Sequence, residues 1–320
     1  MSKVRPNQTQ IRRAIRHRSL PRKPSRGVVL VMVLWIIMLL IVLVSSFVQS
    51  STSEGLQARF LLNSTQARYA AESGLSRAVF ELRNPTIDLR WIADGRPYET
   101  DFEGAKITIK IVDDMGKIDI SVVNLPLFEA MFQSIGVDKL QAQKMAAAMA
   151  DWIDPDDLVN PNGAEKDDYE AAGLGYGPSN RPFVTPSELQ QVLGMSYELF
   201  LKLEDMITIN SGNTQPNGAF AQADVLRALL TQQTGQPPSQ EVIDAFIELR
   251  ANTPRGGTIS LPGGQPLLAQ SNGLTYTIES EAELPNGAKA SLKAVIQLGQ
   301  GSVAQRPFRI VRWRDGSSGQ

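Results

Sequence analysis

The N-terminal sequence is the feature that most constrains this chain. Residues 1–26 contain nine Lys or Arg residues and no acid, and no charged residue follows between Gly27 and Ser53. Seventeen consecutive apolar residues occupy positions 28–44. At about 1.5 Å per residue they form a helix of about 25 Å, and with residues 45–48 this helix is long enough to cross a bilayer. The sequence therefore predicts a membrane-spanning helix over 28–48, preceded by a basic leader, 1–27.

The charge distribution predicts how this helix is oriented. The basic residues precede the apolar run, which favours a cytoplasmic N-terminus, a periplasmic body and an inner-membrane location. A cleaved secretory signal fits less well, because the apolar run is too long and lacks an A-x-A end. The net charge of −1 combines +9 in the leader with −10 in residues 28–320. Such an acidic body suits divalent cations or basic partners and disfavours nucleic acid.

The composition argues against an enzyme. The chain has no Cys, and its one His, His17, lies in the leader. Once the leader is removed, the usual general base, the Cys nucleophile and most zinc sites are excluded. Neither a P-loop nor a G-x-S-x-G motif occurs. A carboxylate pair such as Asp156 and Asp157 is compatible with a glycosidase, but metal binding explains it better.

The helix is expected to continue far beyond the membrane. Residues 49–83 contain no Pro, and Asn84-Pro85 provides a stop signal. An apolar stripe recurs at helical spacing through Leu56, Phe60, Ala67, Ala71, Leu75, Ala78 and Leu82. We therefore expect one helix of about 55 residues over 28–84. The stripe is expected to pack on the chain's own sheet.

The remaining sequence predicts an α+β fold. Alternating residues predict strands at 98–115, 274–284, 288–298 and 306–313, with a turn at 285–287. Helices are predicted at 126–133, 137–152, 197–203, 223–230 and 238–250. A further helix is predicted to begin at Pro186, with Thr185 as its N-terminal cap. The expected order is strands over 85–115, an inserted all-helical domain over 116–262, and the remaining strands of an antiparallel sheet over 263–320.

An acidic loop lies within the predicted helical domain. Residues 151–170 hold eight carboxylates and one Lys. Clustered hard oxygens without His or Cys suit Ca²⁺ better than zinc or iron. The order of the acids is not that of an EF-hand. A solvated acidic loop without metal is the alternative, and composition alone leaves both open.

Residues 127–149 resemble a helix-hairpin-helix motif. Such motifs bind phosphate through a G-h-G loop, but here only Gly136 is present and Asp138 occupies the second glycine position. The acidic body also lacks the cations that DNA binding requires. We interpret residues 127–149 as a packing motif. The less favoured alternative is that they bind DNA and that the chain is a membrane-anchored DNA-binding protein.

Several motifs together resemble one family. They are the leader ending at Gly27, Tyr69-Ala70-Ala71-Glu72-Ser73-Gly74, Asp151-Trp152-Ile153-Asp154, Gly163-Ala164-Glu165, Asn180-Arg181-Pro182-Phe183 and Val192-Leu193-Gly194-Met195. In this order they resemble the K-class minor pseudopilins of type II secretion. The resemblance implies a pilin-like long helix and sheet with an inserted SAM-like or helix-hairpin-helix-like domain. It also implies cleavage after Gly27 by prepilin peptidase and methylation of the new N-terminus, Val28.

The resemblance further implies partners, a structural calcium ion and a place at the tip of the pseudopilus. The expected partners are the I- and J-class minor pseudopilins, the H class and the major pseudopilin. The expected ligands are Asp156, Asp157, Glu165, Asp167 and Asp168, with Asp154 and Asn160 as second choices. Asp151 is expected to cap or pair at the end of its helix, and Trp152 to lie in the core.

One position departs from the usual pilin pattern. The fifth residue after Gly27 is Met32, where most pilins carry the Glu that pairs with a neighbouring subunit's amine. Its absence suits a subunit that initiates or caps the filament for export across the outer membrane. A generic single-span anchored structural protein of the periplasm remains the alternative, and cleavage after Gly27 distinguishes the two.

Overall fold

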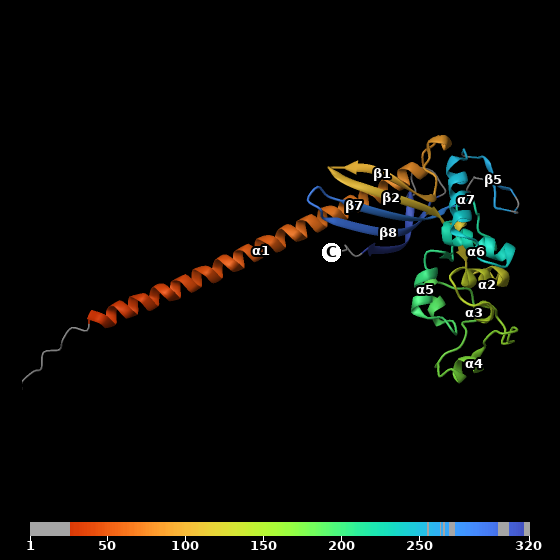
Figure 1. Ribbon diagram of the computed structural model, residues 1–320, viewed down its shortest axis with the longest axis horizontal. Helices are drawn as coiled ribbons and strands as arrows, with labels where there is room; N and C mark the ends of the chain where they lie inside the picture. Colours follow the sequence, from red (N-terminus) through yellow and green to blue (C-terminus); the bar gives the residue numbers. More distant parts are fainter. Residues whose placement is uncertain are drawn as a thin grey trace, which may run out of the picture. The chain divides into compact units, whose positions relative to one another are not determined.

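The computed structural model describes residues 26–254, 256–262, 264, 266–268, 273–299 and 307–316, and its elements are labelled in Figure 1. It divides into two units, residues 1–60 and 61–320. The expected leader, apart from Arg26 and Gly27, lies outside the described residues.

The long N-terminal helix is confirmed. Helix α1 (Arg26–Leu82) is continuous over 57 residues and contains a segment that is long and apolar enough to cross a membrane. The large apolar side chains of residues 28–48 are all about half exposed or more within the chain itself. The helix ends two residues before the expected stop at Asn84-Pro85, because Pro disfavours helical backbone at the residue before it.

The second unit contains a five-stranded antiparallel sheet of order β1-β2-β7-β8-β9. Its strands are β1 (Asp94–Phe102), β2 (Ala105–Asp113), β7 (Thr275–Glu283), β8 (Lys289–Leu298) and β9 (Phe308–Gly316). Strands β2 and β7 are neighbours in the sheet, with residues 114–274 between them in sequence. The expected α+β fold, with helices inserted into an antiparallel sheet, is therefore confirmed.

The single strand expected over 98–115 is wrong. The structure has a hairpin of β1 and β2, with Phe102 opposite Ala105. Glu103 (φ 50°) and Gly104 (φ 83°) make the two-residue turn, and both have the positive φ that such turns require. Glu-Gly is a weaker turn signal than Asn-Gly or Asp-Gly. The alternating residues on both sides of it were therefore interpreted as one strand, and the chain reversal was missed.

The inserted region is mainly helical. It contains α2 (Leu125–Ser134), α3 (Lys139–Ile153), α4 (Lys166–Ala171), α5 (Tyr197–Leu203), α6 (Ala223–Thr234) and α7 (Gln240–Asn252). Short 3₁₀ helices are η1 (Ile87–Leu89), η2 (Asp114–Gly116) and η3 (Pro186–Gln191). Two small strand pairs are β3 (Ile118–Asp119) with β4 (Ile207–Thr208), and β5 (Thr258–Ser260) with β6 (Pro266–Leu268).

Two expectations about these helices need correction. The helix expected from Pro186 is the short 3₁₀ helix η3, and the Thr185 side chain makes no cap hydrogen bond there. A further helix, α4, lies inside the acidic loop, where no helix was expected. Its six residues are too few for an apolar period to appear in the sequence.

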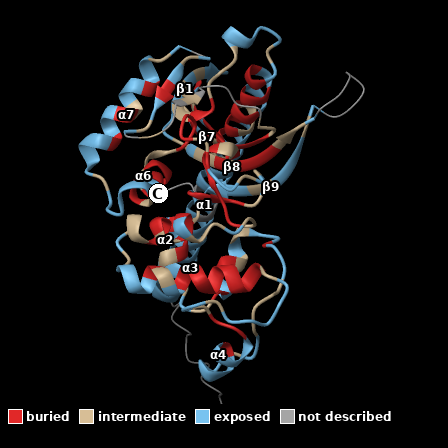
Figure 2. Cartoon of the chain, turned by 90° about the vertical axis from the view of Figure 1, so that its right-hand side faces the viewer, coloured by how far each residue is buried: buried red, intermediate tan, exposed pale blue. Residues whose placement is uncertain are grey.

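Buried side chains form two separate cores, which Figure 2 shows as red segments in the sheet and in the helices. One core joins α1 to the sheet and the other fills the inserted region. On the apolar stripe of α1, Ala67 and the members that follow it are buried, but Leu56 (68%) and Phe60 (65%) are exposed. Within the second unit, the stripe is therefore buried from Ala67 onward.

Gly74 lets α1 approach the sheet closely. A methyl group at this position would collide with Ser280 Oγ and lie 2.8 Å from Ile107 Cγ2. We expect Gly74→Ala to lower the free energy of unfolding by about 1–3 kcal/mol through overpacking, measured by urea denaturation. Gly55→Ala is the matched control in the same helix, because nothing lies within 4 Å of its added methyl group. Equal stabilities of the two variants would contradict this explanation.

Candidate functional sites

The expected processing site lies at the start of α1. Gly27 is the second residue of the helix. Apart from its two neighbours in the chain and the adjacent helix backbone, no atom of the described residues lies within 4 Å of the position a Cβ would occupy. Val28 and Met32 are each 65% exposed. The side chains that follow the 27–28 bond are therefore exposed within their own helix.

The acidic loop is organised by a fully buried carboxylate at the end of α3. Asp151 Oδ1 accepts a hydrogen bond from Asn160 N (3.3 Å), and Oδ2 accepts one from Ala164 N (2.7 Å). A Cβ at Gly163 would overlap Asp151 Oδ2. Asp151 was expected to cap or pair at its helix end. Instead it binds backbone groups nine and thirteen residues further on and folds the loop back.

Four aspartates of the loop raise the pKa of a fifth carboxylate, Glu165. The pKa of Glu165 rises to about 7, first because of burial and then because of the negative charges of Asp151, Asp154, Asp157 and Asp156. Burial and the charges of Asp156 and Asp151 also raise the pKa of Asp154. The fold thus gathers negative charge around Glu165, which a cation would neutralise.

Three oxygens in this region are buried and have no hydrogen-bond partner in the described part of the chain: Asp154 Oδ1, Glu165 Oε1 and Asn180 Oδ1. Asn180 has a positive φ of 48°, and its Nδ2 donates to Asp157 Oδ1 at 3.2 Å. Buried acceptors without donors are costly, and strained backbone is often found at ligand sites. Asn180 was not among the expected ligands, because it lies ten residues beyond the acidic run.

The other two expected ligands belong to helix α4. Asp168 Oδ2 accepts a hydrogen bond from Glu165 N at 3.0 Å, and Asp167 is exposed in the first turn. The negative charges of Asp167 and Asp168 are stabilised by the positive end of the helix dipole. Across the described residues, no three carboxylates lie close enough to hold a metal ion by themselves. The oxygens available are nevertheless of the hard type that Ca²⁺ prefers.

Aromatic side chains anchor the base of this loop. Trp152 is 2% exposed, as expected for a core residue, and stacks on Phe183 with a centroid distance of 6.1 Å. The Tyr169 hydroxyl accepts a hydrogen bond from Leu193 N at 3.0 Å, and burial raises its pKa to about 12. These contacts attach the base of the acidic loop to the core of the inserted region.

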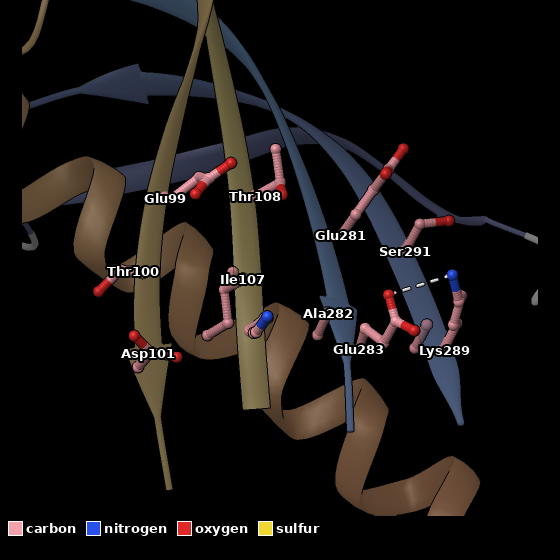
Figure 3. A pocket seen from close by; sticks show the side chains of 12 residues that line it. Glu99, Thr100, Asp101, Ile107, Thr108, Glu281, Ala282, Glu283, Lys289 and Ser291 are labelled. Carbon is pink, nitrogen blue, oxygen red and sulfur yellow. Dashed lines mark ion pairs between the residues drawn. The ribbon is translucent and has the colours of Figure 1, made fainter. Parts of the chain in front are cut away.

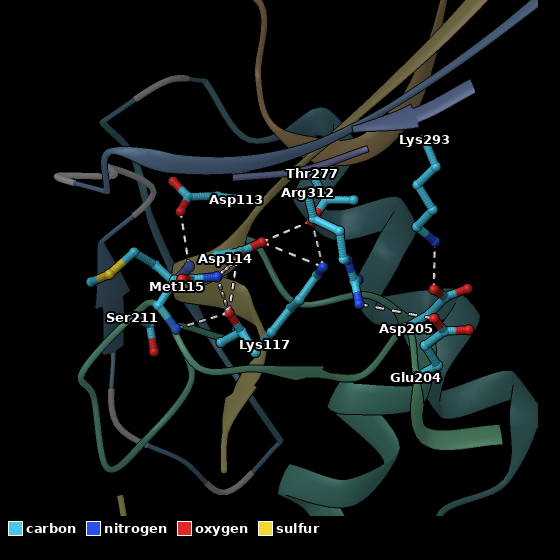
Figure 4. A network of polar contacts seen from close by, with 12 residues as sticks. Asp113, Asp114, Met115, Lys117, Glu204, Asp205, Ser211, Thr277, Lys293 and Arg312 are labelled. Carbon is cyan, nitrogen blue, oxygen red and sulfur yellow. Dashed lines mark hydrogen bonds and ion pairs between the residues drawn. The ribbon is translucent and has the colours of Figure 1, made fainter. Parts of the chain in front are cut away.

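A buried polar network joins the sheet to the inserted region (Figure 4). Asp114 accepts hydrogen bonds from Thr277 Oγ1 of β7 (2.9 Å) and Thr208 Oγ1 of β4 (2.7 Å). Lys117 Nζ lies 3.3 Å from Asp114 Oδ1 and donates to Thr277 Oγ1 at 2.6 Å. Lys293 of β8 also pairs with Asp205 at the edge of the inserted region.

This network predicts that removing Asp114 and removing Lys117 lower the free energy of unfolding by different amounts. Asp114→Ala leaves Lys117 buried without a carboxylate, so we expect a loss of about 3–5 kcal/mol in unfolding free energy. Lys117→Met leaves Asp114 with two hydroxyl donors, so the loss should be smaller. Urea denaturation of both variants measures the difference. A larger loss for Lys117→Met would contradict this assignment.

The outward face of the sheet carries a polar groove of about 530 Å³ (Figure 3). Glu99, Thr108, Glu281 and Ser291 form one cross-strand row there. Ile107 and Ala282 are buried in the core that contains α1. Lys289 Nζ pairs with Glu283 Oε2 at 3.1 Å near the end of the groove.

Comparisons with known proteins agree with this architecture. Residues 111–212 match the family model described as type II secretion system protein K. The chain is 27% identical over 235 residues to type II secretion system protein K of Klebsiella pneumoniae, covering 65% of this chain and 72% of that protein. The protein K of Pectobacterium carotovorum subsp. carotovorum is 25% identical over 205 residues, covering 57% and 62%.

A solved structure shares the fold. One chain in the crystal structure of the GspK-GspI-GspJ complex from the enterotoxigenic Escherichia coli type 2 secretion system superposes with a TM-score of 0.51. It is 17% identical, and the match covers 82% of this chain and all of that one.

The long helix, the antiparallel sheet and the inserted helices therefore share the fold of that chain. Over residues 111–212, and over the regions that align with these relatives, the chain is similar to the type II secretion system protein K family.

Proposed function

We propose that this chain is a minor pseudopilin that initiates or caps the type II pseudopilus at its tip. The observation that carries the proposal is the unequal coverage of α1. Its sheet-facing side is buried from Ala67 onward, while Leu62 (58%), Tyr69 (63%) and Phe80 (64%) are exposed on the opposite side. At 100° per residue these three lie within about 20° of one another, which suits packing against a second helix.

The proposed partners are the I- and J-class minor pseudopilins, then the H class and the major pseudopilin. The similar chain comes from a GspK-GspI-GspJ complex, which supports the first two. Met32 in place of the usual Glu supports a terminal place in the filament, because this side chain cannot pair with the amine of a neighbouring subunit.

Co-purification tests this assembly. Expressed with the I- and J-class pseudopilins of the same system, the tagged chain should retain both in membrane extracts. Leu62→Asp with Tyr69→Asp should abolish retention, because two charges would be buried in an apolar contact. Leu249→Asp is the control, since Leu249 is also exposed (52%) but lies on α7. No retention of either partner by the unmodified chain would refute the proposal.

The proposed route to the filament begins in the inner membrane. Residues 28–48 span it with the N-terminus in the cytoplasm and the body in the periplasm. Prepilin peptidase removes the leader after Gly27, and the new N-terminus, Val28, is methylated. The exposed first turn of α1 and the basic leader support this route.

We also propose a structural Ca²⁺ in the acidic loop. Asp154, Glu165 and Asn180 would hold it through the oxygens that lack other partners, with Asp156 and Asp157 close by. The cation would neutralise their mutual repulsion and order the loop. Asp151 would act as a positioning residue, because its hydrogen bonds set the path of the chain between 154 and 165.

A further inference from the structure

A second cavity, of about 430 Å³, lies at the junction of the end of α1, the segment around η1 and the end of α7. Its apolar walls include Leu82, Trp91, Ile92, Phe220 and Tyr276. Its charged lining consists of Asp88, Arg90, Asp94, Arg96, Asp113 and Arg250. This size lies within the range typical of ligand pockets. The proposed assembly and the acidic loop use none of these residues.

Arg250 is the buried cation of this cavity. Its side chain is 8% exposed, with Nη1 donating to Ala221 O (2.5 Å) and Nη2 to Asp94 O (3.2 Å). Nε is buried, has no hydrogen-bond partner among the described residues, and lies 3.5 Å from Asp94 Oδ2. A buried guanidinium that leaves a donor unused is costly unless another acceptor arrives.

The carboxylate beside Arg250 is already engaged. Both Asp94 oxygens accept hydrogen bonds from the Arg96 guanidinium, Nε to Oδ1 at 2.9 Å and Nη2 to Oδ2 at 2.7 Å. One carboxylate therefore serves two guanidinium groups. Of the other acids, Asp113 accepts a hydrogen bond from Met115 N, and Asp88 is exposed on η1. The Arg90 Nε donates to Asn84 O at 2.6 Å.

We propose that this cavity binds a peptide segment that presents a carboxylate next to an apolar side chain. The carboxylate binds between Arg96 and Arg250, where a second acceptor is lacking, and the apolar group lies against Trp91 and Phe220. Guanidinium groups recognise carboxylates through paired, charge-assisted hydrogen bonds.

The rim favours a peptide over a small free acid. Ile87 (57%) and Leu89 (64%) are exposed on η1, and Ile87 itself lines the cavity. They extend the apolar surface beyond the cavity, so neighbouring residues of a bound segment have further area to cover.

Calorimetry on the 320-residue chain in phosphatidylcholine nanodiscs tests the proposal. The probes are acetyl-Leu-Leu-Phe with a free carboxylate, the same peptide as its C-terminal amide, and 3-phenylpropionate. We expect the acid to bind about tenfold more tightly than the amide, the difference made by a hydrogen-bonded charge. The peptide acid should also bind more tightly than 3-phenylpropionate, because only the peptide reaches the rim.

Two substitutions should act in opposite directions. Arg96→Gln removes a cation and leaves Asp94 to repel the ligand, so the acid should bind about tenfold more weakly. Asp94→Asn removes the competing carboxylate, so the acid should bind several-fold more tightly. Neither should change binding of the amide. Arg309→Gln is the control, because it removes an exposed arginine on β9 outside the cavity.

Equal binding of acid and amide would overturn the proposal, as would absence of binding or an Arg96→Gln variant that binds the acid normally. Tighter binding of 3-phenylpropionate than of the peptide would overturn the choice of a peptide ligand. Thermal unfolding reports whether each variant folds. If Asp94→Asn does not fold, two measurements still test the proposal: the affinity of the acid against that of the amide, and the affinity of Arg96→Gln for the acid.

Discussion

Calcium at a concentration about a hundredfold above its dissociation constant should raise the unfolding midpoint of this chain by about 5–10 °C. Binding at that excess stabilises a folded protein by about 2.7 kcal/mol, and each kcal/mol shifts the midpoint of a domain of this size by about 2–4 °C. The physical source is the group of carboxylates around Glu165, in which Asp154 Oδ1 and Glu165 Oε1 are buried without a hydrogen-bond partner among the described residues. Differential scanning calorimetry with calcium and with a chelator measures the shift.

Substitutions distinguish the ligands that the fold favours from the wider set expected from sequence. Asp154→Asn, Glu165→Gln and Asn180→Ala should each remove most of the calcium-dependent shift. Asp167→Asn should leave it intact, because Asp167 is exposed in the first turn of α4. Magnesium should not replace calcium, because it requires a smaller, near-octahedral site. A shift that survives Glu165→Gln, or its absence in the unmodified chain, would refute the site.

The same group predicts how stability depends on pH without metal. The pKa of Glu165 rises from 4.5 to about 7 on folding, so the folded chain binds this proton more tightly than the unfolded chain. The resulting stabilisation is complete below about pH 4.5 and is lost as the pH rises through about 7. Calcium should prevent this loss, and Glu165→Gln should remove it, in midpoints measured between pH 4.5 and 8.

Long periodic segments could be predicted from the sequence, because each carries its own signal. The apolar run and the stripe through Ala67 and Leu82 predicted α1, and alternation predicted β7 and β8. The β1–β2 turn was missed because Glu103 adopts a positive φ that its residue type does not signal. Helix α4 was missed because it is too short to show a period.

The candidate calcium site was only partly predictable for a different reason. Composition identified the acidic run, but which carboxylates converge depends on Asp151, whose hydrogen bonds to Asn160 and Ala164 set the path of the loop. Asn180 enters the site from a separate segment through its contact with Asp157. Such contacts between segments have no counterpart in local sequence, so neither the role of Asp168 as a helix cap nor that of Asn180 could be foreseen.

Gly27→Leu should prevent removal of the leader and thereby block secretion. Glycine has no side chain, so it permits close approach to the backbone at the bond to be cut. Nothing lies within 4 Å of a Cβ at Gly27, so the substitution disturbs no contact in the described part of the chain. Any failure of cleavage then reports on the peptidase. Mass and N-terminal sequence of the membrane-extracted protein, with and without prepilin peptidase, measure the outcome.

The unmodified chain should begin at Val28 only when the peptidase is present. Gly55→Leu is the matched control, because Gly55 lies in the same helix with equally open space around it, and it should be processed normally. A retained leader keeps nine cations at the cytoplasmic surface, each attracted to anionic lipid by about 1 kcal/mol. Leaving the bilayer for the filament then becomes unfavourable by several kcal/mol, so export should stop. An intact N-terminus in both strains would instead leave a single-span anchored protein of the periplasm.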